Sequence, residues 1–438
     1  MIAVKAPVTL SVSNQQMTWQ QWLAVSVCVL LNVIDGFDIL VMSTAAGAVR
    51  QGLSLSATSL GLILGASLAG MMLGALLLAP LADRYGRRPL ILVCLVVGLA
   101  GMIAAGFSSN SPDLIVCRLV TGLGVGGIMP VLNTITAEVS TPERRNVAIT
   151  LQAIGYPVGG LAAALVGSAV LESHGWRLLL QSACVPTVIG LLAVALFLPE
   201  SVSFLTSRRP INVLARVNSA LGRLGKPPLG SLPTTPPQPG ARSTLRSLLA
   251  GPYTPALALF ASATFLTQFS FYFFLSWVPT VLQPHLAAGP ANTGGAIALN
   301  LGGIVGDLMF GALCLRFRAR PLTLSALIVS FSSVSLLGQV LDMQLVAMSL
   351  VLVAGAALFA AMAGIYAIAP QAFPTLVRAS GTGFAFSLGR LGGTLSPVIG
   401  AYVLNTPKMG VGPGLICMGV PLLAAGLLLL ALRIERGT

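Results

Sequence analysis

Two aspartates stand three residues apart in a long apolar segment near the start of the chain, within the sequence IDGFD. If that segment is helical, Asp35 and Asp38 share one face, because residues three apart are neighbours on a helix. Two carboxylates in apolar surroundings cannot both stay charged at low cost. The pair therefore suits the binding and release of a proton. Two alternatives stay open: a permanent ion pair with Arg118 or Arg390, or ligation of sodium.

Two arginines also fall inside apolar segments. Arg118 opens RLVTGLGVGG, and Arg390 lies within RASGTGFAFSLGRLGG. A guanidinium at membrane depth is costly, so it needs an acidic partner or a water-filled cavity. Arg390 is a candidate for a bidentate ion pair with the carboxylate of a ligand. The alternative is a salt bridge between Arg390 and Asp307.

The elements that position these charges are expected to be membrane-spanning helices. Hydrophobic residues form 55% of the 438 residues and charged residues 8%, with a mean hydropathy of +0.92. Soluble domains carry about 25% charged residues. Apolar runs of roughly 20 residues, the length that crosses a bilayer, recur along the chain. They predict twelve spans, at 21–44, 57–80, 89–107, 113–137, 147–171, 178–198, 254–283, 292–315, 322–340, 345–369, 379–403 and 412–432.

The basic residues are distributed unevenly along this topology. Of the 24 Lys and Arg residues, nineteen fall on one side, Arg50, Arg177 and Lys408 on the other, and Arg118 and Arg390 inside spans. Basic residues favour the cytoplasmic side, so both chain ends are predicted to be cytoplasmic. The net charge of +13 therefore reflects topology rather than binding of nucleic acid. The first span is expected to be retained, not cleaved as a signal.

The chain is predicted to consist of two six-helix bundles, residues 1–198 and 253–438, joined by a cytoplasmic linker, residues 199–252. The front of the linker is basic and amphipathic, and its later part is rich in proline. LGALLLAPLADRYGRRPL at 73–90 is echoed by VGDLMFGALCLRFRARPL at 305–322, an offset of 232 residues, and GYPVGG at 155–160 by GRLGG at 389–393. The halves therefore look duplicated in the same orientation, which predicts a substrate site between them at mid-membrane.

The sequence carries little that favours an enzyme. The six cysteines are scattered without a CxxC pair, and the only histidines, His174 and His285, fall near predicted outer loops. No HExxH, GxSxG or nucleotide-binding loop is present. We therefore expect no catalytic residues, no metal site and no cofactor, and no ATP-driven pump.

LADRYGRRP resembles the signature loop of the major facilitator superfamily, and RLVTGLGVGG resembles its fourth-helix motif. The resemblance implies a fold of twelve helices in two pseudo-symmetric bundles and a cytoplasmic network of gating charges. The alternative is that the arginines only fix topology. In the second copy of the loop Leu315 replaces the aspartate, so no latch is expected there. The implied gating residues are Asp83, Arg84, Arg87, Arg88, Glu138, Arg145 and Arg378.

The motifs DGFD, PESVSFL at 199–205, YFFLSWVPT at 272–280 and RASGTGFAFSLGRLGG at 378–393 are similar to those of the aromatic acid:proton symporter family. The first helix departs from that family in reading MSTAAGAV after DGFD, where many relatives have a glycine and a proline. The resemblance implies proton coupling by Asp35 and Asp38. The expected substrate-binding residues are Arg118, Gln268, Phe269, Tyr272, Phe273, Asp307, Tyr366 and Arg390.

The resemblance further implies import of a small aromatic carboxylate, such as a hydroxybenzoate-type acid, together with protons. The alternative is a proton-coupled exporter of drugs or metabolites from the same superfamily. Tyr156 offers another phenol at depth, and Trp277 is expected at an outer gate or in the interfacial belt. We expect a monomer in the inner membrane of a bacterium, in contact with the lipid bilayer, its substrate and protons.

Overall fold

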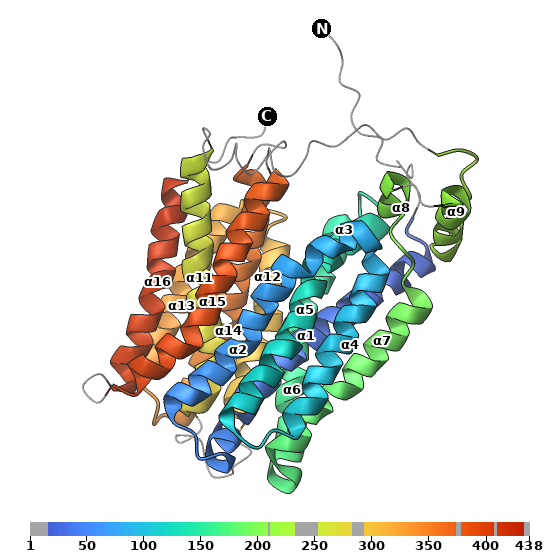
Figure 1. The fold of residues 1–438 in the computed structure, drawn as a ribbon. Coiled ribbons are helices and arrows are strands. Elements are labelled where there is room, and N and C mark those ends of the chain that lie inside the picture. Colours follow the sequence, from blue (N-terminus) through green and yellow to red (C-terminus); the bar gives the residue numbers. More distant parts are fainter. Residues whose placement is uncertain are drawn as a thin grey trace.

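Helices account for nearly all of the part of the chain that the computed structural model describes, namely residues 16–208, 211–232, 253–282, 293–373, 378–406 and 410–432. One group packs together on the right of Figure 1. Its members are α1 Trp19–Gly52, α2 Ala57–Leu77, α3 Ala82–Tyr85, α4 Arg87–Gly106, α5 Ser111–Val139, α6 Arg145–Ser182 and α7 Cys184–Phe197. The second group, on the left, contains α11 Thr254–Leu282, α12 Gly294–Leu313, α13 Ala319–Leu337, α14 Gln344–Ile368, α15 Arg378–Leu404 and α16 Val411–Ala431.

Helices occupy all twelve of the predicted spans. Ten stretches within the described residues are long and apolar enough to cross a membrane, and one of them, 145–197, holds two predicted spans. α6 breaks at Gly175, whose φ of 77° is left-handed, and α7 follows almost directly. The fifth predicted span thus ends near this break, and the sixth begins inside α6. α15 occupies the eleventh predicted span.

Glycines allow neighbouring helices to approach at backbone distance in both groups. On α2, a Cβ placed on Gly70 or Gly74 would overlap a carbonyl oxygen of α5. On α12, a Cβ on Gly302 or Gly306 would overlap a carbonyl oxygen of α14 in the same way. These pairs are related by the offset of 232 residues seen in the sequence repeat. Small residues are typical of helix interfaces in lipid, and here the same interface is built twice.

The two groups meet along three pairs of helices: α1 with α11, α2 with α15, and α6 with α12. Near the start of α2, a Cβ on Gly61 would lie 2.8 Å from the Ala401 side chain of α15. On the same face of α2, three turns further on, Leu76 is exposed. The α2–α15 contact is therefore made at the end of the molecule remote from α3.

Two short helices follow α7 in the predicted linker. They are α8 Val202–Arg208 and α9 Val213–Arg223, and they lie at the same end of the molecule as α3 (Figure 1). The Thr18 hydroxyl, which also caps α1, donates a hydrogen bond of 2.6 Å to the carbonyl of Leu224 just after α9. The basic front of the linker is thus helical and attached to the start of α1. Much of the proline-rich part lies outside the described residues, and the domain boundaries stay a prediction.

Candidate functional site between the two helix groups

Asp38 and Arg118 form a buried ion pair between α1 and α5. Arg118 Nη1 donates to Asp38 Oδ1 at 2.8 Å, and both side chains are nearly inaccessible. Arg118 Nη2 also donates to the Asp38 backbone carbonyl at 2.9 Å. Of the two alternatives left by the sequence, a permanent ion pair therefore holds for Asp38 in this conformation. Arg118 is engaged by a protein carboxylate and is not exposed towards a ligand.

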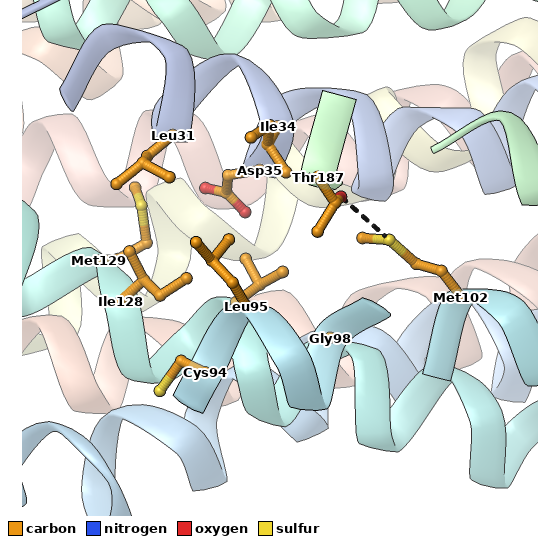
Figure 2. Close-up of a pocket in the computed structure, with 11 residues that line it drawn as sticks. Leu31, Ile34, Asp35, Cys94, Leu95, Gly98, Met102, Ile128, Met129 and Thr187 are labelled. Atoms are coloured by element: carbon orange, nitrogen blue, oxygen red, sulfur yellow. Dashed lines mark hydrogen bonds between the residues drawn. The ribbon is translucent and has the colours of Figure 1, made fainter. Parts of the chain in front are cut away.

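Asp35 differs from Asp38 although it lies one turn away. Its side chain is 2% exposed, and neither carboxylate oxygen has a hydrogen-bond partner. It lines a narrow cavity enclosed by α1, α4, α5 and α7 (Figure 2). The rest of the lining is apolar apart from Thr187 and the Cys94 thiol. One aspartate of the motif is thus locked in an ion pair, and the other is free to gain or lose a proton.

Arg390 lies on α15 among phenols from both helix groups. The guanidinium is close enough to act electrostatically on Tyr272 of α11, Tyr366 of α14 and Asp35. Tyr156 of α6 lies beside Tyr272, and its buried hydroxyl makes no hydrogen bond of normal geometry. Arg390 is only partly buried and forms no salt bridge with any residue in the described ranges. A cation with three phenols nearby can bind a carboxylate attached to an aromatic ring.

The face of α11 that carries Gln268 and Tyr272 packs on glycines of α15. A Cβ on Gly389 would lie 2.7 Å from the Gln268 amide nitrogen, and a Cβ on Gly393 would touch the Tyr272 ring. Gln268 and Tyr272 therefore lie within a turn of Arg390.

The other two aromatic candidates on α11 are placed differently. Phe269 is half-buried and stacks on Phe265, with ring centroids 6.4 Å apart. Phe273 is fully buried against Gly400 and Phe274, so it packs α11 against α15 instead of facing Arg390. Trp277 is also buried and donates a hydrogen bond of 3.0 Å to the Pro397 carbonyl, which places it in the protein interior and not in an interfacial belt.

Asp307 is buried on α12 and forms no ion pair with any described residue. The salt bridge with Arg390 that the sequence left open is thus not made in this conformation. Asp307 lies near enough to Tyr366 to act on it electrostatically, so it borders the same group of phenols. The Tyr366 ring is half exposed and lies 4.7 Å from the Phe386 ring.

The predicted gating charges gather at the end of the molecule that carries α3 and α8. Arg87, at the start of α4, forms an ion pair with Glu138 near the end of α5. Arg88 Nη2 donates to the Ala195 carbonyl of α7 at 2.5 Å. Arg145 Nε donates to the Ala137 carbonyl at 3.1 Å. Arg84 lies over the Tyr85 ring, while the Arg378 side chain lies outside the described residues.

Glu200 was missed by the sequence analysis, although the motif that contains it was noted. Its carboxylate accepts hydrogen bonds from the backbone nitrogens of Arg87 at 2.9 Å and Arg88 at 3.3 Å, and so caps the start of α4. A Cβ on Gly86, which has a left-handed φ of 108°, would lie 2.6 Å from this carboxylate. A glycine before a helix start, paired with a carboxylate after the sixth span, was the available signal.

Ser201 joins the same network. Its hydroxyl donates to Glu138 Oε2 at 2.7 Å, beside the ion pair of Glu138 with Arg87. The charged loop between α2 and α4, the end of α5 and the residues after α7 are thus one connected network.

The fold and the buried charges are those of a secondary membrane transporter, and the comparisons agree. Residues 28–434 match the family model described as Major Facilitator Superfamily, and the chain belongs to that family. Its members are transporters and not enzymes.

Curated relatives of similar length transport aromatic acids according to their names. The chain is 29% identical to a gallate transporter of Pseudomonas putida, over 98% of this chain and 96% of the relative. It is 30% identical to a 3-(3-hydroxy-phenyl)propionate transporter of Escherichia coli, over 91% and 92% of the two chains. The fold resembles the partially occluded, inward-open xylose transporter XylE from E. coli, with a TM-score of 0.75 and 18% identity over 96% of this chain and all of that one.

Proposed function

We propose that the protein imports a small aromatic carboxylate together with protons, by alternating access of a site between the two helix groups. The observation that carries the proposal is Arg390, a partly buried cation without a salt bridge to any described residue, set beside Tyr272 and Tyr366. An anionic group with an aromatic ring satisfies both features. The names of the curated relatives support the same substrate class.

In this proposal the two aspartates of the first helix have different roles. Asp35 accepts the transported proton, since both its oxygens lack hydrogen-bond partners. Asp38 stays paired with Arg118 and holds α1 against α5. Charge is balanced because the substrate anion neutralises Arg390 while the proton neutralises Asp35. Release of both to the cytoplasm returns the carrier to its starting charge.

The short α2–α15 contact supports alternating access, because it leaves one end of this interface open to rearrangement. The charged network around Arg87 and Glu138 lies at that end and is placed to break or form as the halves rock. The excess of basic residues supports a cytoplasmic location for this end in a bacterial inner membrane. We also infer that the monomer transports, since each half supplies the other's partner.

The proposal is tested with purified protein in liposomes. An inwardly directed proton gradient should drive accumulation of labelled 4-hydroxybenzoate, and collapse of the gradient should abolish it. A thermal-shift panel of benzoates, phenylpropanoates and non-aromatic acids tests the substrate class. Stabilisation by non-aromatic acids alone would overturn the aromatic assignment. Substrate movement only against the direction of proton entry would favour the alternative, a proton-coupled exporter.

A further inference from the structure

The cavity beside Asp35 lies wholly within the first group of helices. Its lining comes from α1, α4, α5 and α7, whereas the phenols around Arg390 come from α6, α11 and α14. Figure 2 shows the Asp35 carboxylate directed towards α4, with the Thr187–Met102 hydrogen bond of 3.3 Å at one end of the cavity. We call this space the Asp35 cavity. Asp35 thus faces a second compartment besides the one that contains Arg390.

We propose that the Asp35 cavity is a binding site for water, and that a water molecule held there passes the transported proton to and from Asp35. This inference rests on the proposed proton coupling and adds a route to it. In the uptake step a hydronium ion in the cavity gives one proton to a carboxylate oxygen of Asp35 and becomes water. In the release step the carboxylic acid returns the proton to that water.

The first argument is the state of the carboxylate. Both oxygens of Asp35 are inaccessible, and neither has a hydrogen-bond partner. Buried polar groups without a protein partner are usually satisfied by ordered water, which needs a polar, roomy site. The cavity offers space for about one water molecule. Its polar atoms are the two Asp35 oxygens, with the Thr187 hydroxyl and the Cys94 thiol also in the lining.

The second argument is the absence of competing charge among the residues that line the cavity. α4, α5 and α7 contribute no ionisable side chain to it except Cys94. The charged groups that act on Asp35 are Arg390 of α15 and Asp38 of its own helix, and Asp35 in turn acts on Tyr156 and Tyr272. A proton donor reaching Asp35 from the cavity therefore does not pass the substrate cation, Arg390.

Gly98 of α4 provides a way to fill the cavity. It lines the cavity, and a Cβ added there would meet only the Thr121 carbonyl oxygen, at 3.8 Å. A side chain at this position therefore takes the space of the water without displacing backbone. Ala100 on the same helix is exposed and provides the matched control, because Ala100→Val adds bulk away from the cavity.

The experiment compares wild type, Gly98→Ala, Gly98→Val and Ala100→Val in liposomes. We expect Gly98→Val to lose at least about tenfold in proton-driven accumulation of 4-hydroxybenzoate, since ΔpH-driven uptake needs the relay. Binding of 4-hydroxybenzoate and its exchange across the membrane at equal pH should stay within about twofold of wild type. Ala100→Val should behave as wild type, and Gly98→Ala should show the same defect to a smaller degree.

Infrared difference spectroscopy gives a readout that does not depend on the substrate or on transport. The carbonyl band of protonated Asp35, identified by its loss in Asp35→Asn, should move to higher frequency in both Gly98 variants, because a hydrogen bond from water is removed. An unmoved band, or full proton-driven accumulation in Gly98→Val, would overturn the water site. If wild type itself shows no proton-driven uptake of any aromatic acid, the proposed function fails, while the band still tests the water site.

Discussion

Arg118 holds Asp38 through two atoms at once, the carboxylate at 2.8 Å and the backbone carbonyl at 2.9 Å. The second bond ties the side chain of α5 to the main chain of α1. Since Asp38 is buried, its carboxylate depends on this partner. Loss of one member of a buried pair costs about 3–5 kcal/mol, because the other charge is left uncompensated.

Arg118→Leu is therefore expected to destabilise the protein strongly. We expect a drop of about 3–5 kcal/mol in the free energy of unfolding, measured in detergent by denaturant or thermal unfolding. Arg118→Leu combined with Asp38→Leu should recover a large part of that loss, because no buried charge is left. A double variant as unstable as Arg118→Leu alone would show that the ion pair is not the cause.

Asp35→Asn is expected to separate substrate movement from proton movement. The amide cannot take up the proton, so accumulation driven by a pH gradient should vanish. Exchange of labelled for unlabelled substrate at equal pH should continue, since Arg390 and the phenols are untouched. Asp38→Asn serves as the comparison, and we expect it to impair folding first. Proton-driven accumulation retained by Asp35→Asn would contradict the coupling role.

Arg390 is expected to bind the substrate carboxylate. A hydrogen bond to a charged group contributes about 1.5–3 kcal/mol, so Arg390→Gln should weaken binding of 4-hydroxybenzoate by roughly ten- to 150-fold. Arg390→Lys should recover part of the affinity, since the charge is kept but the planar fork is lost. Titration calorimetry measures both, with Arg223→Gln on α9 as a control for lost positive charge. Equal affinity in wild type and Arg390→Gln would remove Arg390 from the site.

Glu200 is expected to stabilise the start of α4. Glu200→Ala removes the acceptor for the Arg87 and Arg88 nitrogens, and loss of a helix cap costs about 1 kcal/mol. Thermal unfolding should show this decrease, and Glu200→Gln should show a smaller one. The matched control is Glu143→Gln, at an exposed position. An effect of Glu143→Gln as large as that of Glu200→Ala would argue for general charge loss.

Two glycine substitutions should differ sharply. A Cβ on Gly122 would overlap the Ser67 carbonyl oxygen, whereas a Cβ on Gly222 of α9 has no atom within 4 Å. Gly122→Ala should force α2 and α5 apart and destabilise the protein by about 1–3 kcal/mol. Gly222→Ala should be neutral or slightly stabilising, because alanine favours helix. Thermal unfolding of the two variants side by side checks the contrast.

The helical spans were predictable because each needs only a local property, an apolar run long enough for the bilayer. The break in α6 was not placed correctly, because the glycine that makes it stands among many glycines that do not. Gly175 adopts a left-handed φ, while Gly159 and Gly160 stay in regular helix. The sequence shows which residues are glycines but not which of them bend the chain.

The partners of the buried charges were only partly predictable. Positions three apart on a helix differ by about 60° in direction, since each residue turns the helix by about 100°. That angle directs Asp38 to Arg118 and Asp35 into the cavity, and which aspartate takes which place depends on the rotation of α1. Glu200 depends on contact between segments more than a hundred residues apart, which no local pattern encodes.

The repeated glycine contacts bear on how the chain arose. Gly159 of α6 touches the Val33 carbonyl of α1, and 233 residues later Gly392 of α15 touches the Phe265 carbonyl of α11. At the same offsets, 232 or 233, Asp35 corresponds to Thr267 and Arg390 to Pro157. Duplication of an ancestral gene would leave this pattern if selection kept the packing and let the chemistry diverge. One copy then specialised in the proton and the other in the anion, on a common set of helix contacts.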